Sequence, residues 1–161
     1  MIRILKPSDI DAVMNIWLSS NIQAHSFIPR EYWMKYFGQV KEMLPDATVY
    51  VYEDNGSVQG FIGLTKNYIE GIFVEESMRG KGIGTQLLNL AKQLCSSLTL
   101  QVYEKNQSAL RFYFKEGFQI KKKQMDSETG QMDFTMEWSM KFFLFTKSQH
   151  FYFMNEKRVW V

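Results

Sequence analysis

The stretch that decides the fold is residues 69–94, which read IEGIFVEESMRGKGIGTQLLNLAKQL. It begins as an apolar, β-prone strand over 69–74 and ends as an amphipathic helix after residue 85. Between the two lies a basic loop with Gly80, Gly82 and Gly84 at every second position. Such a loop at the head of a helix gathers unpaired backbone N–H groups beside the positive end of the helix dipole. The sequence therefore predicts a site for a polyanion, most simply a pyrophosphate.

The glycine spacing narrows the choice of ligand. A P-loop needs Gly-Lys followed by Ser or Thr, whereas Lys81 is followed by Gly82. The dinucleotide fingerprint G-x-G-x-x-G has a different spacing from the three glycines here. The pattern that fits is R-x-x-G-x-G, which runs from Arg79 to Gly84. Both common nucleotide-binding loops are therefore disfavoured.

A second motif follows about twenty residues downstream. Residues 98–103, LTLQVY, predict a strand, and residues 106–118, NQSALRFYFKEGF, predict a helix that begins at Asn106 and stops at Gly117. In this order the two motifs resemble those of the GNAT superfamily of acyl-CoA-dependent N-acetyltransferases, in its small single-domain bacterial form. The resemblance covers about residues 1–140. The residues that match the N-x-x-A-x-x-x-Y-x-x-x-G-F motif are Asn106, Ala109, Tyr113, Gly117 and Phe118.

The order of the other predicted elements gives the fold class. A first strand precedes a helix with Ser8 as its N-cap, and a second helix follows Pro29. Asn55-Gly56 joins two strands in a hairpin, and a last hairpin pairs about 118–125 with 131–140. We expect an α/β (α+β) fold with a mixed, centrally parallel sheet and helices on both faces, as the resemblance also implies.

Composition sets further limits. A length of 161 residues fits one domain, and 19 basic against 17 acidic side chains give a net charge of +2, too small to indicate a nucleic-acid partner. No apolar run approaches 18 residues, and no signal-like segment opens the chain, so we expect a cytoplasmic protein without a membrane partner. A single cysteine excludes an internal disulfide. No His, Cys, Asp and Glu spacing indicates a metal.

Residues 141–161 differ from the rest, because seven of these 21 residues are aromatic. The family resemblance ends before this extension. We therefore expect a GNAT domain over 1–140 and an aromatic-rich C-terminal extension that either packs on that domain or forms a homodimer. The sequence leaves both alternatives open.

The resemblance assigns the cosubstrate, acetyl-CoA, and the residues that bind it. In the family, the strand before the loop pairs with the pantetheine arm, and a main-chain N–H near its centre polarises the thioester carbonyl. The loop binds the pyrophosphate, and the Asn of the second motif lies near the pantetheine, although capping alone would explain Asn106. The expected cosubstrate-binding residues are Ile72, Phe73, Val74, Arg79, Gly80, Lys81, Gly82, Ile83, Gly84, Thr85, Asn106 and Tyr113.

The catalytic candidates are Tyr113 and Glu70. The family's matching tyrosine points at the coenzyme sulfur, so Tyr113 is the expected general acid for the leaving thiolate, with simple packing as the alternative. Glu70 is a candidate base, unless it faces solvent. His25 could be a base, a substrate contact or a structural residue, and Tyr68 could line the amine entrance or be a strand-edge aromatic. Family members that modify protein N-termini often carry a glutamate where Gln101 stands here, so that acceptor is disfavoured.

The resulting hypothesis is an N-acetyltransferase. It transfers the acetyl group of acetyl-CoA to a primary amine, either a protein lysine or a small molecule, by direct attack in a ternary complex. The alternatives are a non-catalytic coenzyme A sensor and an interaction module centred on the aromatic extension.

Overall fold

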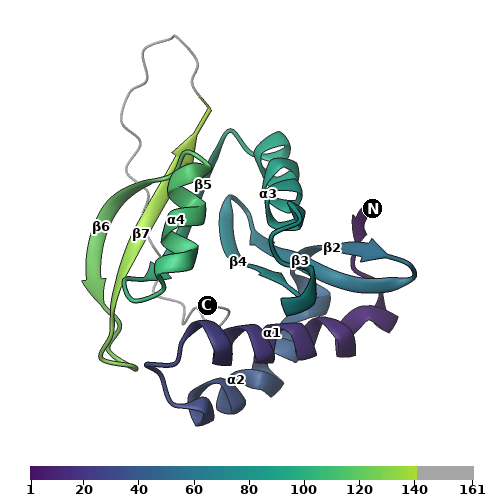
Figure 1. Cartoon of the computed structure of the whole chain (residues 1–161), viewed down its shortest axis with the longest axis horizontal. Coiled ribbons are helices and arrows are strands. Elements are labelled where there is room, and N and C mark those ends of the chain that lie inside the picture. The colour runs from purple at the N-terminus through teal and green to yellow at the C-terminus, as the bar shows by residue number, and fades with distance from the viewer. Residues whose placement is uncertain (141–161) are drawn as a thin grey trace.

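A computed structural model describes residues 1–140 of the chain (Figure 1). Within these residues the elements follow the predicted order. The strands are β1 (Ile2–Ile4), β2 (Thr48–Asp54), β3 (Ser57–Thr65), β4 (Tyr68–Val74), β5 (Ser97–Tyr103), β6 (Gln119–Met125) and β7 (Met132–Ser139). The α-helices are α1 (Ile10–Ala24), α2 (Arg30–Met43), α3 (Ile83–Leu94) and α4 (Gln107–Lys115).

The strands form one mixed sheet in the order β1-β2-β3-β4-β5-β7-β6. Its central neighbours β4 and β5 are parallel because α3 crosses between them, and every other neighbouring pair is antiparallel. The β2–β3 hairpin turns at Asn55 and Gly56, whose φ angles of 50° and 77° are those that a tight type I′ turn requires. The predicted fold class and hairpin are confirmed.

The sheet separates two hydrophobic cores. On one face, α1 and α2 pack on β2, β3 and β4, and the core includes Trp17, Trp33, Val51, Phe61 and Phe73. On the other face, α3 and α4 pack on β3, β4, β5 and β7, and the core includes Ile62, Leu87, Leu100, Tyr113 and Met136. Helices therefore cover both faces, as expected (Figure 1).

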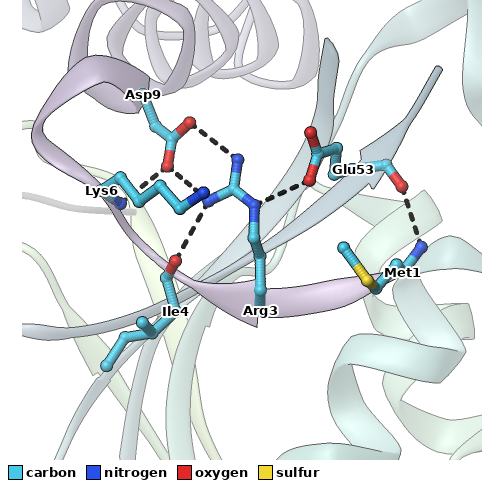
Figure 2. Close-up of polar contacts among 6 residues, drawn as sticks. All are labelled: Met1, Arg3, Ile4, Lys6, Asp9 and Glu53. Atoms are coloured by element: carbon cyan, nitrogen blue, oxygen red, sulfur yellow. Dashed lines mark hydrogen bonds and ion pairs between the residues drawn. The ribbon is translucent and has the colours of Figure 1, made fainter. Parts of the chain in front are cut away.

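The start of α1 differs from the prediction that Ser8 is its N-cap. Pro7–Asp9 form a short 3₁₀ helix, and α1 begins at Ile10. The carboxylate of Asp9 accepts a hydrogen bond of 2.7 Å from the Lys6 backbone N–H, and its two oxygens lie 2.7 and 3.0 Å from the Arg3 guanidinium. Arg3 also pairs with Glu53 of β2 at 2.8 Å (Figure 2). This network joins β1 to the first helical turn and to the neighbouring strand β2.

We expect Asp9→Asn to destabilise the protein by about 1–2 kcal/mol at pH 7, because it removes the charge that Arg3 pairs with. The Arg3 guanidinium lowers the pKa of Asp9, so this stabilisation is complete above the unfolded-state pKa of about 3.9 and is lost as the pH falls through the lower folded-state pKa. Denaturant unfolding should show the wild-type advantage at pH 7 and its loss below about pH 4.

Asp11→Asn is the matched control, because Asp11 is exposed and its ion pair with Lys41 at 3.3 Å lies in water. Equal stability of wild type and Asp9→Asn at pH 7 would contradict the role of the Arg3 network.

The expected packing or dimerisation of the aromatic extension, residues 141–161, lies outside the described residues. Over residues 1–140, none of the helices has both the length and the apolar character needed to cross a bilayer.

Candidate active site

The two parallel strands at the centre of the sheet separate soon after they meet. Among the described residues, Tyr68 and Thr99 are the one β4–β5 register pair, with the Thr99 N–H donating to the Asn67 carbonyl at 3.0 Å. In contrast, β4 stays paired with β3 as far as Val74. The β5-facing edge of β4 is therefore open beyond Tyr68, in the middle of a buried sheet.

The pairing of β3 with β4 determines which backbone groups face this opening. The Glu75 N–H donates to the Gln59 carbonyl at 2.8 Å, and ladder hydrogen bonds alternate along an antiparallel pair. Phe73 is therefore hydrogen-bonded to β3, whereas the backbone groups of Ile72 and Val74 point toward β5. The expected N–H donor near Phe73 must come from Ile72 or Val74, not from Phe73 itself.

The Phe73 side chain lies on the opposite face of the sheet from Ile72 and Val74. Its ring stacks on Phe61 with 5.0 Å between centroids and folds back over Gly71. A Cβ at Gly71 would collide with the Phe73 ring in its present position, so a larger residue there would require the ring to move.

The glycine loop at the end of β4 includes two residues in the left-handed region of backbone conformation. Gly80 and Gly82 have φ angles of 75° and 83°, and a Cβ on either would enter open space. The first backbone hydrogen bond of α3 runs from the Gln86 N–H to the Gly82 carbonyl at 3.0 Å, so the amides before it lack an intrahelical acceptor. Loop and helix start thus form a concave site that suits phosphate oxygens.

Two side chains of the loop that were predicted to bind the cosubstrate, Arg79 and Thr85, also contact other elements of the protein. Arg79 donates to the Val74 carbonyl at 3.0 Å and to the Ser20 hydroxyl of α1 at 3.3 Å, so it braces the loop against β4 and α1. The Thr85 hydroxyl donates to Glu116 at 2.9 Å, which links α3 to the end of α4. No feature of the sequence singles out Ser20 or Glu116 as a partner of the loop, because a lone Ser or Glu on a helix is common.

A cavity of about 750 Å³ extends from the glycine loop, between β4 and β5, to α1 and α4. Lys81 lies outside its lining, and the Lys81 amine contacts the Met78 sulfur at 3.7 Å. Tyr68 and Glu70 are also absent from the lining. The predicted residues that the cavity brings together are His25, Ile72, Phe73, Val74, Arg79, Gly80, Gly82, Ile83, Gly84, Thr85, Asn106 and Tyr113.

Tyr113 projects from α4 into this cavity and is 8% exposed. Its ring makes edge-on contacts with Phe112 and Phe118, at 5.1 and 5.4 Å between centroids. Burial raises the pKa of Tyr113 above its ordinary value, because the phenolate would be poorly solvated. Tyr113 therefore keeps its proton at physiological pH and can act as a donor.

Glu70 is the extra residue of a β-bulge in β4, because Gly71 pairs with Gly63 and Ile69 pairs with Leu64. Its side chain is buried, 6% exposed, so the solvent-facing alternative is wrong. Glu70 lies between two residues that line the cavity, Ile69 and Gly71.

Tyr68 is also buried rather than placed at an open entrance. Its hydroxyl donates to the Gln101 side chain at 3.1 Å, across the single β4–β5 register pair. Gln101 itself lines the cavity. Tyr68 therefore contacts the cavity wall through Gln101.

His25 and Asn106 meet across the cavity. The Asn106 side chain accepts a hydrogen bond from the Ala109 N–H at 3.2 Å and caps α4, as predicted, and its amide nitrogen lies 3.2 Å from His25 Nε2. Within residues 1–140, no group of three His, Cys, Asp or Glu side chains is arranged to hold a metal ion.

A split pair of parallel strands with a glycine loop at its end and a buried tyrosine beside it is the arrangement expected of an acyl-CoA-dependent acyltransferase. Comparison with known proteins identifies the family, since residues 10–118 match the model of the acetyltransferase (GNAT) family. The chain belongs to this family. The expected N-acetyltransferase activity is thereby supported, and a non-catalytic sensor is not favoured.

Relatives and solved structures agree with this assignment. The chain is 32% identical over 140 residues to the peptidyl-lysine N-acetyltransferase YiaC of Escherichia coli, covering 86% of this chain and 96% of that protein. The solution structure of apo YjaB from Escherichia coli matches with a TM-score of 0.76 at 26% identity, over 85% of this chain and 95% of that one.

A putative streptothricin acetyltransferase from Bacillus anthracis was solved in complex with acetyl coenzyme A. It matches with a TM-score of 0.54 at 25% identity, over 58% of this chain and 62% of that one. This complex supports acetyl-CoA as the cosubstrate.

Proposed function

We propose that this protein transfers the acetyl group of acetyl-CoA to the side-chain amine of lysine residues in proteins. The observation that carries the proposal is the match to a peptidyl-lysine N-acetyltransferase over nearly the whole length of both chains. The proposal includes residues 1–140 as the catalytic domain, a cytoplasmic location and a reaction without a metal. Nucleic acid and membranes are not among the proposed partners.

The cosubstrate fits the groups that line the cavity. We assign the pyrophosphate to the amides of the glycine loop and the start of α3, where Gly80 and Gly82 leave open space. We assign the amide-rich pantetheine arm to the β5-facing backbone edge of β4, at Ile72 and the Val74 N–H, since the Val74 carbonyl already accepts from Arg79. Acetyl-CoA supplies a thioester, whose carbonyl carbon accepts the amine.

The proposed reaction is a direct attack of the neutral lysine amine on the thioester carbonyl. A C–N bond forms, the C–S bond breaks, and the amine loses a proton. Tyr113, whose raised pKa keeps its proton in place at neutral pH, donates that proton to the departing sulfur, and the proton that the attacking nitrogen loses returns to the phenolate, so the products are the amide and the free thiol of coenzyme A. Lysine is more than 99% protonated at neutral pH, from its pKa of about 10.4. We propose Glu70 as the base that removes this proton through water, because it is the buried carboxylate next to the cavity lining.

The test is thiol release from acetyl-CoA in the presence of matched acceptors. A lysine peptide, the same peptide with arginine in place of lysine, a peptide with a free N-terminus and no lysine, a polyamine and an aminoglycoside form the panel. Release with the lysine peptide alone is expected, and mass spectrometry should find one acetyl group on the lysine. Release only with a small-molecule amine would overturn the lysine assignment.

A further inference from the structure

His25 lies where α1 meets the start of α4. It is 3% exposed, and its ring stacks on Trp33 with 5.0 Å between centroids and 25° between planes. Phe27 and Tyr103 contact the ring edge-on at 5.7 and 5.2 Å. Aromatic side chains thus hold the imidazole from three sides. Its Nε2 atom is directed at Asn106.

The cap of α4 determines the direction of the His25–Asn106 hydrogen bond. Asn106 Oδ1 already accepts from the Ala109 N–H, so the atom that faces His25 is the amide nitrogen, which can only donate. His25 Nε2 therefore accepts with its lone pair, and the ring proton is on Nδ1. Burial lowers the pKa of His25 to about 4, partly opposed by the Asn21 carbonyl, so the ring is neutral at physiological pH.

We propose that His25 is a positioning residue for acetyl transfer: its Nε2 accepts a hydrogen bond from Asn106 and thereby fixes the first turn of α4, the helix that carries Tyr113. The inference rests on the proposed function, since it assigns His25 a part in the same reaction. Of the alternatives for His25, it disfavours the base, because the lone pair that a base needs is already used.

The consequence for catalysis follows from the geometry of α4. Asn106 supports the first turn twice, through its side chain at Ala109 and through its carbonyl, which accepts from the Leu110 N–H at 3.1 Å. Tyr113 follows Ala109 by four residues, so it lies one turn further along the same face. A change in the position of the first turn moves the Tyr113 hydroxyl, and a misplacement of about 1 Å can lower a rate about 100-fold.

Two variants separate the hydrogen bond from packing. His25→Phe keeps an aromatic ring on Trp33 but removes the acceptor, whereas His25→Gln provides a side-chain oxygen near the position of Nε2. We expect His25→Phe to lower kcat about 10–100-fold, with a smaller effect on the KM of acetyl-CoA. The factor by which kcat falls should be the same at each pH from about 6 to 9.5. His25→Gln should recover most of the rate. Phe27→Leu, which alters the same cluster without a polar contact, should leave kcat within about twofold of wild type.

Three outcomes would overturn the proposal. A loss that fades as the pH approaches the amine pKa of about 10.4 would make His25 the base. An equal loss in the Phe and Gln variants would exclude the acceptor role, and an unchanged kcat in His25→Phe would leave His25 as packing alone.

Two further measurements test the role of His25. The first uses a variant of Asn106, in case His25→Phe folds poorly, and the second needs no amine acceptor. Asn106→Ser retains a capping oxygen but lacks the amide N–H. Its effect on kcat should not add to that of His25→Phe in the double variant, because both remove the same contact. Amide hydrogen exchange at Ala109 and Leu110 should accelerate in His25→Phe without any acceptor present. If the lysine assignment is wrong, exchange still responds; if the role of His25 is wrong, it does not.

Discussion

Gly82→Val should weaken coenzyme A binding at least about 100-fold, which corresponds to about 2.7 kcal/mol. Gly82 has a φ of 83°, and the space beyond its α carbon is open in the protein and assigned here to phosphate oxygens. Valine would fill this space and would also disfavour the backbone conformation that directs the amides of the loop inward. Isothermal titration calorimetry with coenzyme A measures the loss directly.

The control for Gly82→Val is Gly56→Val. Gly56 has a φ of 77° and equally open surroundings, but it lies in the β2–β3 hairpin, away from the cavity. Both substitutions carry similar backbone strain, so both should lower the melting temperature. Gly56→Val should bind coenzyme A with wild-type affinity. If Gly82→Val also bound normally, the phosphate site would be wrong.

The second large effect is expected for Tyr113→Phe, which should lower kcat about 10²–10⁴-fold with little change in acetyl-CoA affinity. The substitution preserves the ring contacts with Phe112 and Phe118 and removes only the proton donor. Because the pKa of Tyr113 is raised, wild-type kcat should show no fall from its ionisation between pH 7 and 9. Steady-state kinetics across this range checks both statements.

Tyr50→Phe is a suitable control for the loss of a tyrosine hydroxyl, since Tyr50 lies on β2, outside the cavity lining. Its kinetics should match those of the wild type. Unchanged turnover in Tyr113→Phe would reduce Tyr113 to a packing role, and a loss confined to acetyl-CoA affinity would make it a binding residue instead of an acid.

The fold was predictable because its signals are local and agree with one another. Asn55-Gly56 specifies a turn, and Gly80 and Gly82 both adopt positive φ angles, for which glycine is the favoured residue. Strand and helix periodicity between them gave the order of elements. In contrast, the predicted N-cap at Ser8 was wrong. Asp9 is held by Arg3, and Arg3 in turn pairs with Glu53, which lies fifty residues further along the chain and beyond any local pattern.

The site was predictable only in its backbone. Ile72 and Val74 follow from the resemblance to the family, and Asn106 follows from that resemblance and from helix capping, but side-chain partners depend on tertiary contacts. The brace from Arg79 to Ser20 and the link from Thr85 to Glu116 join residues 59 and 31 positions apart. Glu70 is buried at a bulge of β4, and no residue type in the strand predicts that bulge.

The single register pair between β4 and β5 has a consequence for the stability of the protein. Beyond Tyr68, the β5-facing groups of β4 have no strand partner among the described residues, so a pantetheine arm bound there as proposed would complete the sheet much as an added strand would. A ligand at 100 times its Kd stabilises a folded protein by about 2.7 kcal/mol. The lifetime of this protein against unfolding and proteolysis should therefore follow the supply of acetyl-CoA, falling when that metabolite is scarce.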